Sequence, residues 1–296
     1  MTAGGRAAQT VAMPLGALLL VLFAAVCHST WNLLVKADAR RLEIQSGALV
    51  VGTLICAPVL LRFSPWELTG LAWAMIALSA MFESGYVLAL SAAYGAGELS
   101  LVYPIARGSA PVLVAPLAVL LLGERLSLQG LAGIGLVVLG ILTSHGVAGG
   151  LTVVRTHGRA VAWALLTGIC IAAYSLVNKV GVGLAPVGLY AFLVFLVNTI
   201  VVHLLAWLGG GALPTLRRDA PWGRIALVGV LMMSAYLAVL TAMSLARVSY
   251  VVAAREVSVV IAAIMGTVAL RERHSATRIA GAVTIFAGLC VLALAR

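Results

Sequence analysis

The chain has 296 residues, of which 63% are hydrophobic and only 9% charged, and its mean hydropathy is +1.14. A soluble domain carries about 25% charged residues, and a soluble fold of this size cannot bury so much apolar surface. Lipid must therefore solvate most of this surface. The net charge of +10 does not indicate nucleic-acid binding, because the arginines lie in short segments between apolar runs rather than along one helix face.

Ten apolar runs follow one another, separated by short charged or Gly/Pro-containing segments. A helix that crosses a bilayer needs about 20 mostly apolar residues, and the runs lack the alternation of barrel strands. The predicted fold class is an all-α membrane protein with about ten transmembrane helices, multi-pass in the inner (plasma) membrane. The predicted spans are 13–36, 44–62, 68–94, 99–122, 127–146, 160–180, 186–208, 222–246, 248–270 and 276–295. The first is a membrane helix rather than a signal peptide, because the run continues without a convincing cleavage signal.

The two halves of the chain resemble each other. Charged residues are scarce here, so matched charges and glycines are not explained by composition. The matched positions are Cys27 with Cys170, Lys36 with Lys179, Arg107 with Arg255, Glu124 with Glu272, Gly133 with Gly281, and Gly140 with Gly288. We predict a first repeat at 12–146, a connecting loop at 147–158 and a second repeat at 159–296. Five spans per half, an odd number, invert the second half in the membrane, as in many transporters.

The arginines between the spans bear on topology. The side of the membrane away from the termini carries the larger share, and the positive-inside rule then puts both termini outside. That side holds Arg40, Arg41, Arg155, Arg159, Arg217, Arg218, Arg224, Arg271, Arg273 and Arg278. The side of the termini holds Arg6, Arg62, Arg125, Lys179, Arg247 and Arg296.

A short tetrad lies between the last two predicted spans of each half. It reads Gly-Glu-Arg-Leu at 123–126 and Arg-Glu-Arg-His at 271–274, so the second copy departs from the first at two positions. With the two five-helix halves, the tetrads resemble the EamA-type members of the drug/metabolite transporter superfamily over nearly the whole chain. The stretches 28–36 and 99–108 resemble a subgroup with members named for an association with phosphonate utilisation. The resemblance implies a metabolite transporter with its termini in the cytoplasm, which conflicts with the loop charges.

Polar side chains in the first span are candidate functional groups, because an ionisable group at a helix centre costs about 2.5–3.5 kcal/mol. His28, Asn32 and Lys36 share one helix face, and Trp31 adjoins it. This face predicts a cavity wall with a titratable histidine. The alternative is structural: Lys36 reaches the interface and His28 bonds a neighbouring helix. The matching, weaker face of the second half carries Tyr174, Ser175, Asn178 and Lys179.

The third and fourth spans carry the other candidates. Glu83 and Tyr86 lie one turn apart, and Glu83 either carries a proton or pairs with Arg107. Tyr103 and Arg107 flank Pro104, whose ring bends the helix and frees a carbonyl group.

Arg107 is the first candidate for solute binding and its repeat mate Arg255 is the second. Two guanidinium groups are suited to an anionic group, because each offers bidentate hydrogen bonds to a carboxylate or phosphate. The alternative is that Arg107 with Glu83, or Arg255 with Glu256, form internal charge pairs. Adjacent residues point to different helix faces, so we do not expect Arg255 and Glu256 to neutralise each other.

Two features are expected to be structural. Glu124 and Glu272 are turn residues, expected to cap the following helix together with Ser127 and Ser275. Gly133 and Gly140, like their mates Gly281 and Gly288, lie two turns apart on one face. Small faces let membrane helices approach closely, so the last helix of each half is expected to pack on its counterpart.

The leading hypothesis is a secondary active transporter, an exporter or exchanger, that moves a small anionic or zwitterionic metabolite by alternating access. The predicted substrate contacts are Arg107, Arg255, Tyr103, Trp31, Asn32, Lys36, Tyr86 and Tyr174, and the predicted proton-coupling residues are His28, Glu83 and Glu256. The alternatives are an integral membrane lipid-modifying enzyme and a non-transporting assembly subunit. Scattered, symmetric polar residues disfavour a catalytic centre, and the lack of long soluble loops disfavours a subunit. We expect no cofactor or metal, no partner beyond the bilayer and a solute, and a monomer or homodimer.

Overall fold

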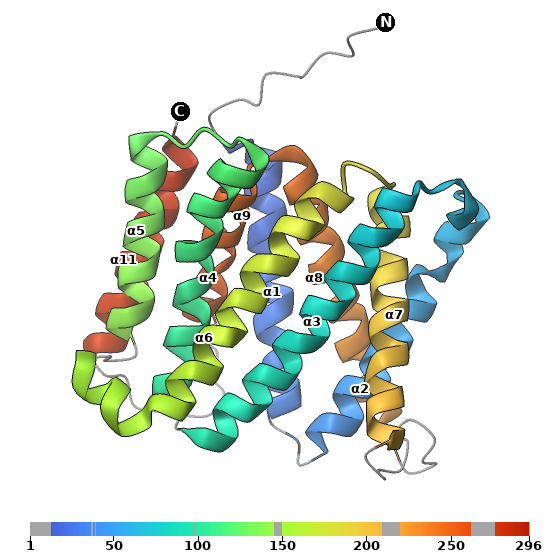
Figure 1. Cartoon of the computed structure of the whole chain (residues 1–296), viewed down its shortest axis with the longest axis horizontal. Coiled ribbons are helices and arrows are strands. Elements are labelled where there is room, and N and C mark those ends of the chain that lie inside the picture. Colours follow the sequence, from blue (N-terminus) through green and yellow to red (C-terminus); the bar gives the residue numbers. More distant parts are fainter. Residues whose placement is uncertain are drawn as a thin grey trace, which may run out of the picture.

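The computed structural model describes residues 13–36, 38, 40–97, 99–144, 150–208, 220–261 and 276–295. Within these ranges every regular element is a helix, and the long helices stand side by side in one bundle (Figure 1). The first half contains α1 (Leu15–Lys36), α2 (Arg41–Cys56), the short 3-10 helices η1 (Ala57–Leu61) and η2 (Pro65–Glu67), α3 (Gly70–Ala96), α4 (Leu99–Leu122) and α5 (Leu128–Ser144). The second half contains α6 (Gly150–Gly181), α7 (Val187–Leu208), α8 (Trp222–Leu245), α9 (Val248–Arg255) and α11 (Ala276–Leu294).

Seven segments of the described chain are long and apolar enough to cross a membrane. They lie in α1, α2 with η1, α3, α4, α6, α7 and α8, while the apolar parts of α5 and α11 are shorter. The predicted span 248–270 differs most from the structure. Helix α9 ends at Arg255, Glu256 forms a turn, and 257–261 is helical again. The rest of this predicted span lies outside the described residues.

Two breaks in the helices differ from the sequence prediction. The predicted span 44–62 is helical only to Cys56, and η1 continues it with Pro58 in its first turn. Proline has no N–H to donate, so the tighter 3-10 turn replaces the α-helix there. Within the predicted connecting loop 147–158, the described chain is helical from Gly150, and α6 has one residue with non-helical backbone angles, His157 (φ −126°, ψ 29°).

Contacts between the two halves hold the bundle together. The most extensive contacts join α5 to α11, α3 to α6, α1 to α8, α4 to α6 and α2 to α8, so each pairs a helix of one half with a helix of the other. The arrangement is visible in Figure 1, where α5 and α11 form one end of the bundle and α2 and α7 the other. The buried centre of the molecule is therefore the seam between the halves.

Glycines allow the close packing of α5 on α11. A Cβ atom added to Gly140 would lie 2.7 Å from the carbonyl oxygen of Gly281, and one added to Gly133 would lie 3.0 Å from that of Gly288. Any side chain at these positions would force the helices apart. The predicted packing of the last helix of each half on its counterpart is confirmed.

Candidate functional site

A cluster of two arginines and a glutamate lies at the seam between the halves. We call Arg107, Arg255, Glu256, Tyr174 and Ser258 the arginine cluster. Arg107, on α4, is 6% exposed, and its Nε lies 3.1 Å from Oε2 of the fully buried Glu256, which follows α9. The Nη2 of Arg107 also donates to the Ser258 hydroxyl at 3.2 Å. Because α4 and α9 belong to different halves, this ion pair joins them.

The side chains of Arg255 and Glu256, at the end of α9, point in different directions. Arg255 is the last residue of the helix, and Glu256 forms the turn that follows it. Glu256 contacts Arg107 on α4, whereas the Nη2 of Arg255 donates to the Tyr174 hydroxyl on α6 at 3.3 Å. Among the described residues, neither of the alternative charge pairs is present: Arg107 is paired with Glu256 rather than with Glu83, and Arg255 is not paired with Glu256, as expected for adjacent residues on different helix faces.

Arg255 has no anionic partner among the described residues. Its Nε is buried and has no hydrogen-bond acceptor, and Oε1 of Glu256 is likewise buried without a donor. Two guanidinium groups and one carboxylate leave this cluster with one positive charge in excess. Unsatisfied buried polar atoms are rare in proteins, and each of them calls for a partner such as a water molecule, an ion or a ligand.

Aromatic side chains border the arginine cluster. The rings of Tyr174 and Tyr86 meet edge to face, with centroids 6.3 Å apart. On α1, His28 and Trp31 pack in the same manner at 5.0 Å, and His28 lies within electrostatic range of both arginines. The structure thus places Tyr174 against Arg255, Tyr86 against Tyr174, and His28 near both arginines.

Other predicted contacts are not placed in the cluster. The Nδ2 of Asn32 donates to the carbonyl oxygen of His28 at 2.7 Å, and its side chain is exposed. The Asn32 amide therefore forms its hydrogen bond within its own helix rather than with the arginine cluster. The side chains of Lys36 and Tyr103 lie outside the described part of the structure.

A second polar cluster surrounds Glu83 on α3. We call Glu83, Ser79, Asn178, Asn198 and Tyr236 the carboxylate cluster. Oε2 of Glu83 accepts from Asn198 Nδ2 at 2.8 Å, and Oε1 accepts from the Tyr236 hydroxyl at 2.9 Å. Ser79 Oγ lies 3.4 Å from Oε1 and 2.6 Å from Asn178 Oδ1.

Within the carboxylate cluster, Glu83 accepts its hydrogen bonds from uncharged donors. No cation of the described chain lies within ion-pair distance of Glu83. Asn198 is on α7 and Tyr236 on α8, so the second half supplies most of the donors to a carboxylate of the first half. Neither of these two residues was predicted from the sequence. The signal for Asn198 was an amide within an otherwise apolar run, whereas Tyr236 resembles any aromatic residue of a membrane helix.

The comparison with known families decides the classification. The model of the EamA-like transporter family matches residues 15–144 and, a second time, residues 158–294. The chain belongs to the EamA-like transporter family. A solved structure titled "Crystal structure of protein" is similar, at 16% identity over 94% of this chain and 96% of that chain, with a TM-score of 0.74. At this identity the likeness shows the fold alone. No curated protein matches the chain.

Membership of this family confirms several predictions. The chain is a multi-pass membrane protein with two EamA repeats, from a family of transporters rather than enzymes. The resemblance to EamA-type members of the drug/metabolite transporter superfamily is likewise confirmed.

Charged residues also hold the break between α8 and α9 of this EamA-like transporter. Lys179 Nζ donates to the carbonyl oxygens of Met243 and Ala246, which end α8. At the start of α9, Glu124 accepts from the Val248 N–H at 2.7 Å and from the Ser249 hydroxyl at 2.6 Å. Opposite charges thus compensate the opposite helix ends. Lys179 is a cap here, not part of a cavity wall.

The prediction that Glu124 caps the following helix is therefore wrong. Glu124 caps α9 of the other half, and Ser127 alone caps the following helix α5, where its Oγ accepts from the Gly130 N–H at 3.1 Å. The sequence does not show this because α9 starts more than a hundred residues after Glu124. The second tetrad, 271–274, and Ser275 lie outside the described residues.

Proposed function

We propose that this EamA-like transporter is a secondary active transporter of a small anionic or zwitterionic metabolite, which binds at the arginine cluster. The observation that carries the proposal is the unpaired guanidinium of Arg255 beside the Arg107–Glu256 ion pair. A charge within a membrane bundle is costly unless it serves binding or pairing. A carboxylate or phosphate oxygen is the ligand that would satisfy the Nε of Arg255.

The bordering side chains fit a small polar solute. Tyr174 holds one side of Arg255, with Tyr86 packed against its ring, and His28 lies near both arginines. Glu256 would contact a solute ammonium group through Oε1, which has no donor among the described residues. The site therefore suits a zwitterion as well as an anion. Arg107 would set the position of Glu256 and so act on the solute indirectly.

Alternating access requires that the two halves move around this site, and the helix contacts support an inverted relationship between them. Helix α1 packs on α8, and α3 packs on α6. An axis that relates α1 to α6 and α3 to α8 would convert the first of these contacts into the second. Each remaining mate packs on its counterpart: α2 on α7, α4 on α9 and α5 on α11. These features are those of inverted-repeat transporters with a site near the midplane.

We assign proton coupling to Glu83 first, with His28 and Glu256 as further candidates. Glu83 is surrounded by neutral donors, so one proton can be gained or lost there without breaking an ion pair. Helix α6 contributes Asn178 to the carboxylate cluster and Tyr174 to the arginine cluster, and α3 carries both Glu83 and Tyr86, whose ring packs against Tyr174. A rearrangement around Glu83 would therefore move the aromatic border of the solute site.

Two finer assignments accompany this proposal. The stretches 28–36 and 99–108 support placement in the subgroup named for an association with phosphonate utilisation. The apolar helices and family membership support residence in the inner (plasma) membrane.

Flux measurements test the proposal. Purified protein in proteoliposomes would be assayed with a panel of amino acids, organic acids and phosphorylated metabolites, with and without a pH gradient. We expect saturable flux of an anionic or zwitterionic solute that Arg255→Ala abolishes and that Arg40→Gln, a control at an exposed arginine, leaves intact. Flux of cations only, or flux that is unchanged in Arg255→Ala, would overturn the proposed site.

A further inference from the structure

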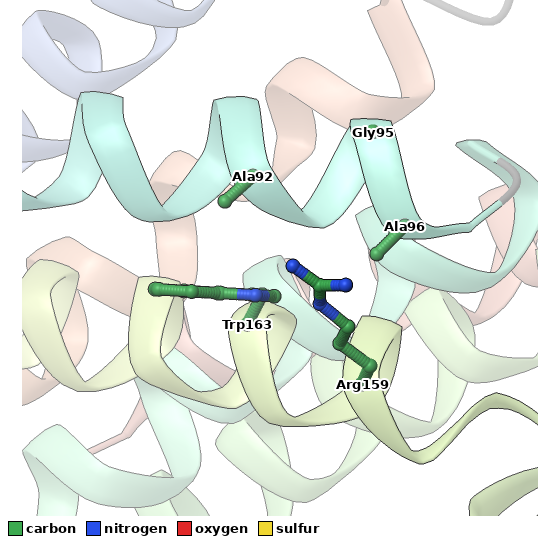
Figure 2. A pocket seen from close by; sticks show the side chains of 5 residues that line it. All are labelled: Ala92, Gly95, Ala96, Arg159 and Trp163. Atoms are coloured by element: carbon green, nitrogen blue, oxygen red, sulfur yellow. The ribbon is translucent and has the colours of Figure 1, made fainter.

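A cavity of about 390 Å³ lies between α3 and α6, away from both polar clusters. Its lining consists of Ala92, Gly95 and Ala96 on α3 and of Arg159 and Trp163 on α6. Figure 2 shows Arg159 and Trp163 reaching from α6 toward Ala92 and Ala96. The three small residues leave space, while the arginine supplies the charge and the indole a flat apolar face. None of the described residues that line this cavity is a carboxylate.

The position of the cavity along the helices is that of a lipid headgroup. The apolar part of α6 begins at His157, so Arg159 lies at the membrane boundary and Trp163 one turn deeper. On the other wall, α3 ends at Ala96. Tryptophan is enriched at this level of the bilayer, and arginine there contacts phosphate groups.

Exposed residues border the cavity. Gly95 and Arg159 are exposed. One turn toward the membrane centre, Leu88 on α3 is 58% exposed and Leu166 on α6 is 40% exposed. Leu88 precedes Ala92 by one turn and Leu166 follows Arg159 by two, so each lies on the helix face that lines the cavity. An acyl chain would lie along these two leucines.

Arg159 is available for a ligand. None of the described side chains forms a hydrogen bond or ion pair with its guanidinium group. The same side of the membrane also carries Arg40 and Arg224, so the surrounding charge attracts anions.

We propose that this cavity is a binding site for an anionic phospholipid. Arg159 contacts the phosphate, Trp163 packs against the glycerol backbone, and the acyl chain follows the seam between α3 and α6. Ala92, Gly95 and Ala96 are small because the headgroup occupies the space that larger side chains would fill. The proposal rests on this cavity alone and does not depend on the solute site.

Native mass spectrometry of the full chain in detergent tests this assignment. The delipidated protein is titrated with dioleoylphosphatidylglycerol or with dioleoylphosphatidylcholine, which has the same acyl chains but no net charge. Arg159→Gln removes the charge, and Gly95→Leu places a side chain in the cavity, where a Cβ atom at Gly95 would meet no atom within 4 Å. Arg40→Gln is the matched control, an exposed arginine on the same membrane side and outside the cavity. Thermal unfolding of each variant verifies that it is folded.

We expect the wild-type chain to retain phosphatidylglycerol over phosphatidylcholine, and each cavity variant to lose about fivefold in affinity for the anionic lipid. Arg40→Gln should keep the wild-type affinity. Equal retention of the two lipids, or an equal loss in Arg40→Gln, would overturn the proposal. Glycerol 3-phosphate is added as a soluble competitor. If glycerol 3-phosphate displaces the lipid at millimolar concentration, the cavity binds a free phosphate ester and the lipid assignment is wrong.

Discussion

Separating Arg107 from Glu256 perturbs the ion pair that joins the two halves. The carboxylate of Glu256 is fully buried and the side chain of Arg107 is 7% exposed. Removing one partner of such a pair leaves a buried charge uncompensated, which costs about 3–5 kcal/mol. Replacing both partners with apolar residues of similar volume is close to neutral, because neither charge then remains buried. We therefore expect Arg107→Met and Glu256→Leu each to destabilise the protein, and the double variant to recover most of the loss.

A double-mutant cycle in detergent measures this coupling. The apparent midpoint of thermal unfolding is followed by fluorescence for the wild type, both single variants and the double variant. We expect the double variant to unfold at a higher temperature than either single variant, which corresponds to a favourable coupling of about 2 kcal/mol or more. Ser258→Ala serves as a reference, because it removes one hydrogen bond donated by the Arg107 guanidinium but keeps the ion pair, and it should cost about 1.5–3 kcal/mol.

The cycle also separates stability from transport. If the two residues act only as a structural tie, the double variant should regain flux together with stability. If Glu256 contacts the solute, the double variant should be stable and inactive. Additive losses in the double variant, with no recovery, would refute the reasoning that the two charges neutralise each other in the folded protein.

Four further predictions follow from the same contacts. Arg255→Lys should raise the KM for the solute about tenfold while leaving stability within about 1 kcal/mol of wild type, as measured by flux and thermal unfolding, because a lysine keeps the charge but not the planar set of donors. Glu83→Gln should abolish the response of flux to an imposed pH gradient but retain solute exchange, whereas the exposed Glu67→Gln should behave as wild type; a preserved pH response in Glu83→Gln would exclude this coupling site. Gly140→Ala should destabilise the α5–α11 contact by about 1–3 kcal/mol, while Gly135→Ala on the same helix, where a Cβ meets no atom within 4 Å, should have no such effect in thermal unfolding. The Arg40 N–H, and after it Arg224, lowers the pKa of Asp38 below its ordinary value of 3.8. The ionised Asp38 therefore stabilises the folded protein above pH 3.8, and this stabilisation disappears as the pH falls through the lower pKa of the folded state. The midpoint of thermal unfolding should accordingly be less sensitive to acid in Asp38→Asn than in the wild type.

The helices were largely predictable because each one has a local cause. Apolar runs of about 20 residues can satisfy their backbone in lipid only as helices, so the sequence predicts their positions directly. The glycine spacing on the last helix of each half is also a local pattern, and it predicted the α5–α11 contact. The break after Cys56 had a local signal as well, in Pro58.

The partners of the charged residues were not predictable, because they depend on which distant helix faces them. The sequence offers several carboxylates as possible partners of Arg107. Only the packing of α4 against α9 makes Glu256 the partner. In the same way, the carboxylate cluster assembles around Glu83 from α7 and α8, and Glu124 caps a helix of the other half. An apolar helix shows no preferred face when lipid and protein interior are equally apolar, so hydropathy alone does not orient it.

The difference between the repeats supports the choice of Arg255 over Arg107 for the proposed solute site. The sequence ranked Arg107 first and Arg255 second, on the assumption that the two mates act alike. The residue after Arg107 is Gly108, whereas the residue after Arg255 is Glu256, so only the second half supplies a carboxylate at this position. Since Glu256 turns toward Arg107, the charge of the first-half arginine is neutralised and that of the second-half arginine is not. The duplication thus provides two equivalent guanidinium groups, and the one unmatched carboxylate pairs with Arg107, which is why we propose Arg255 as the solute-binding arginine.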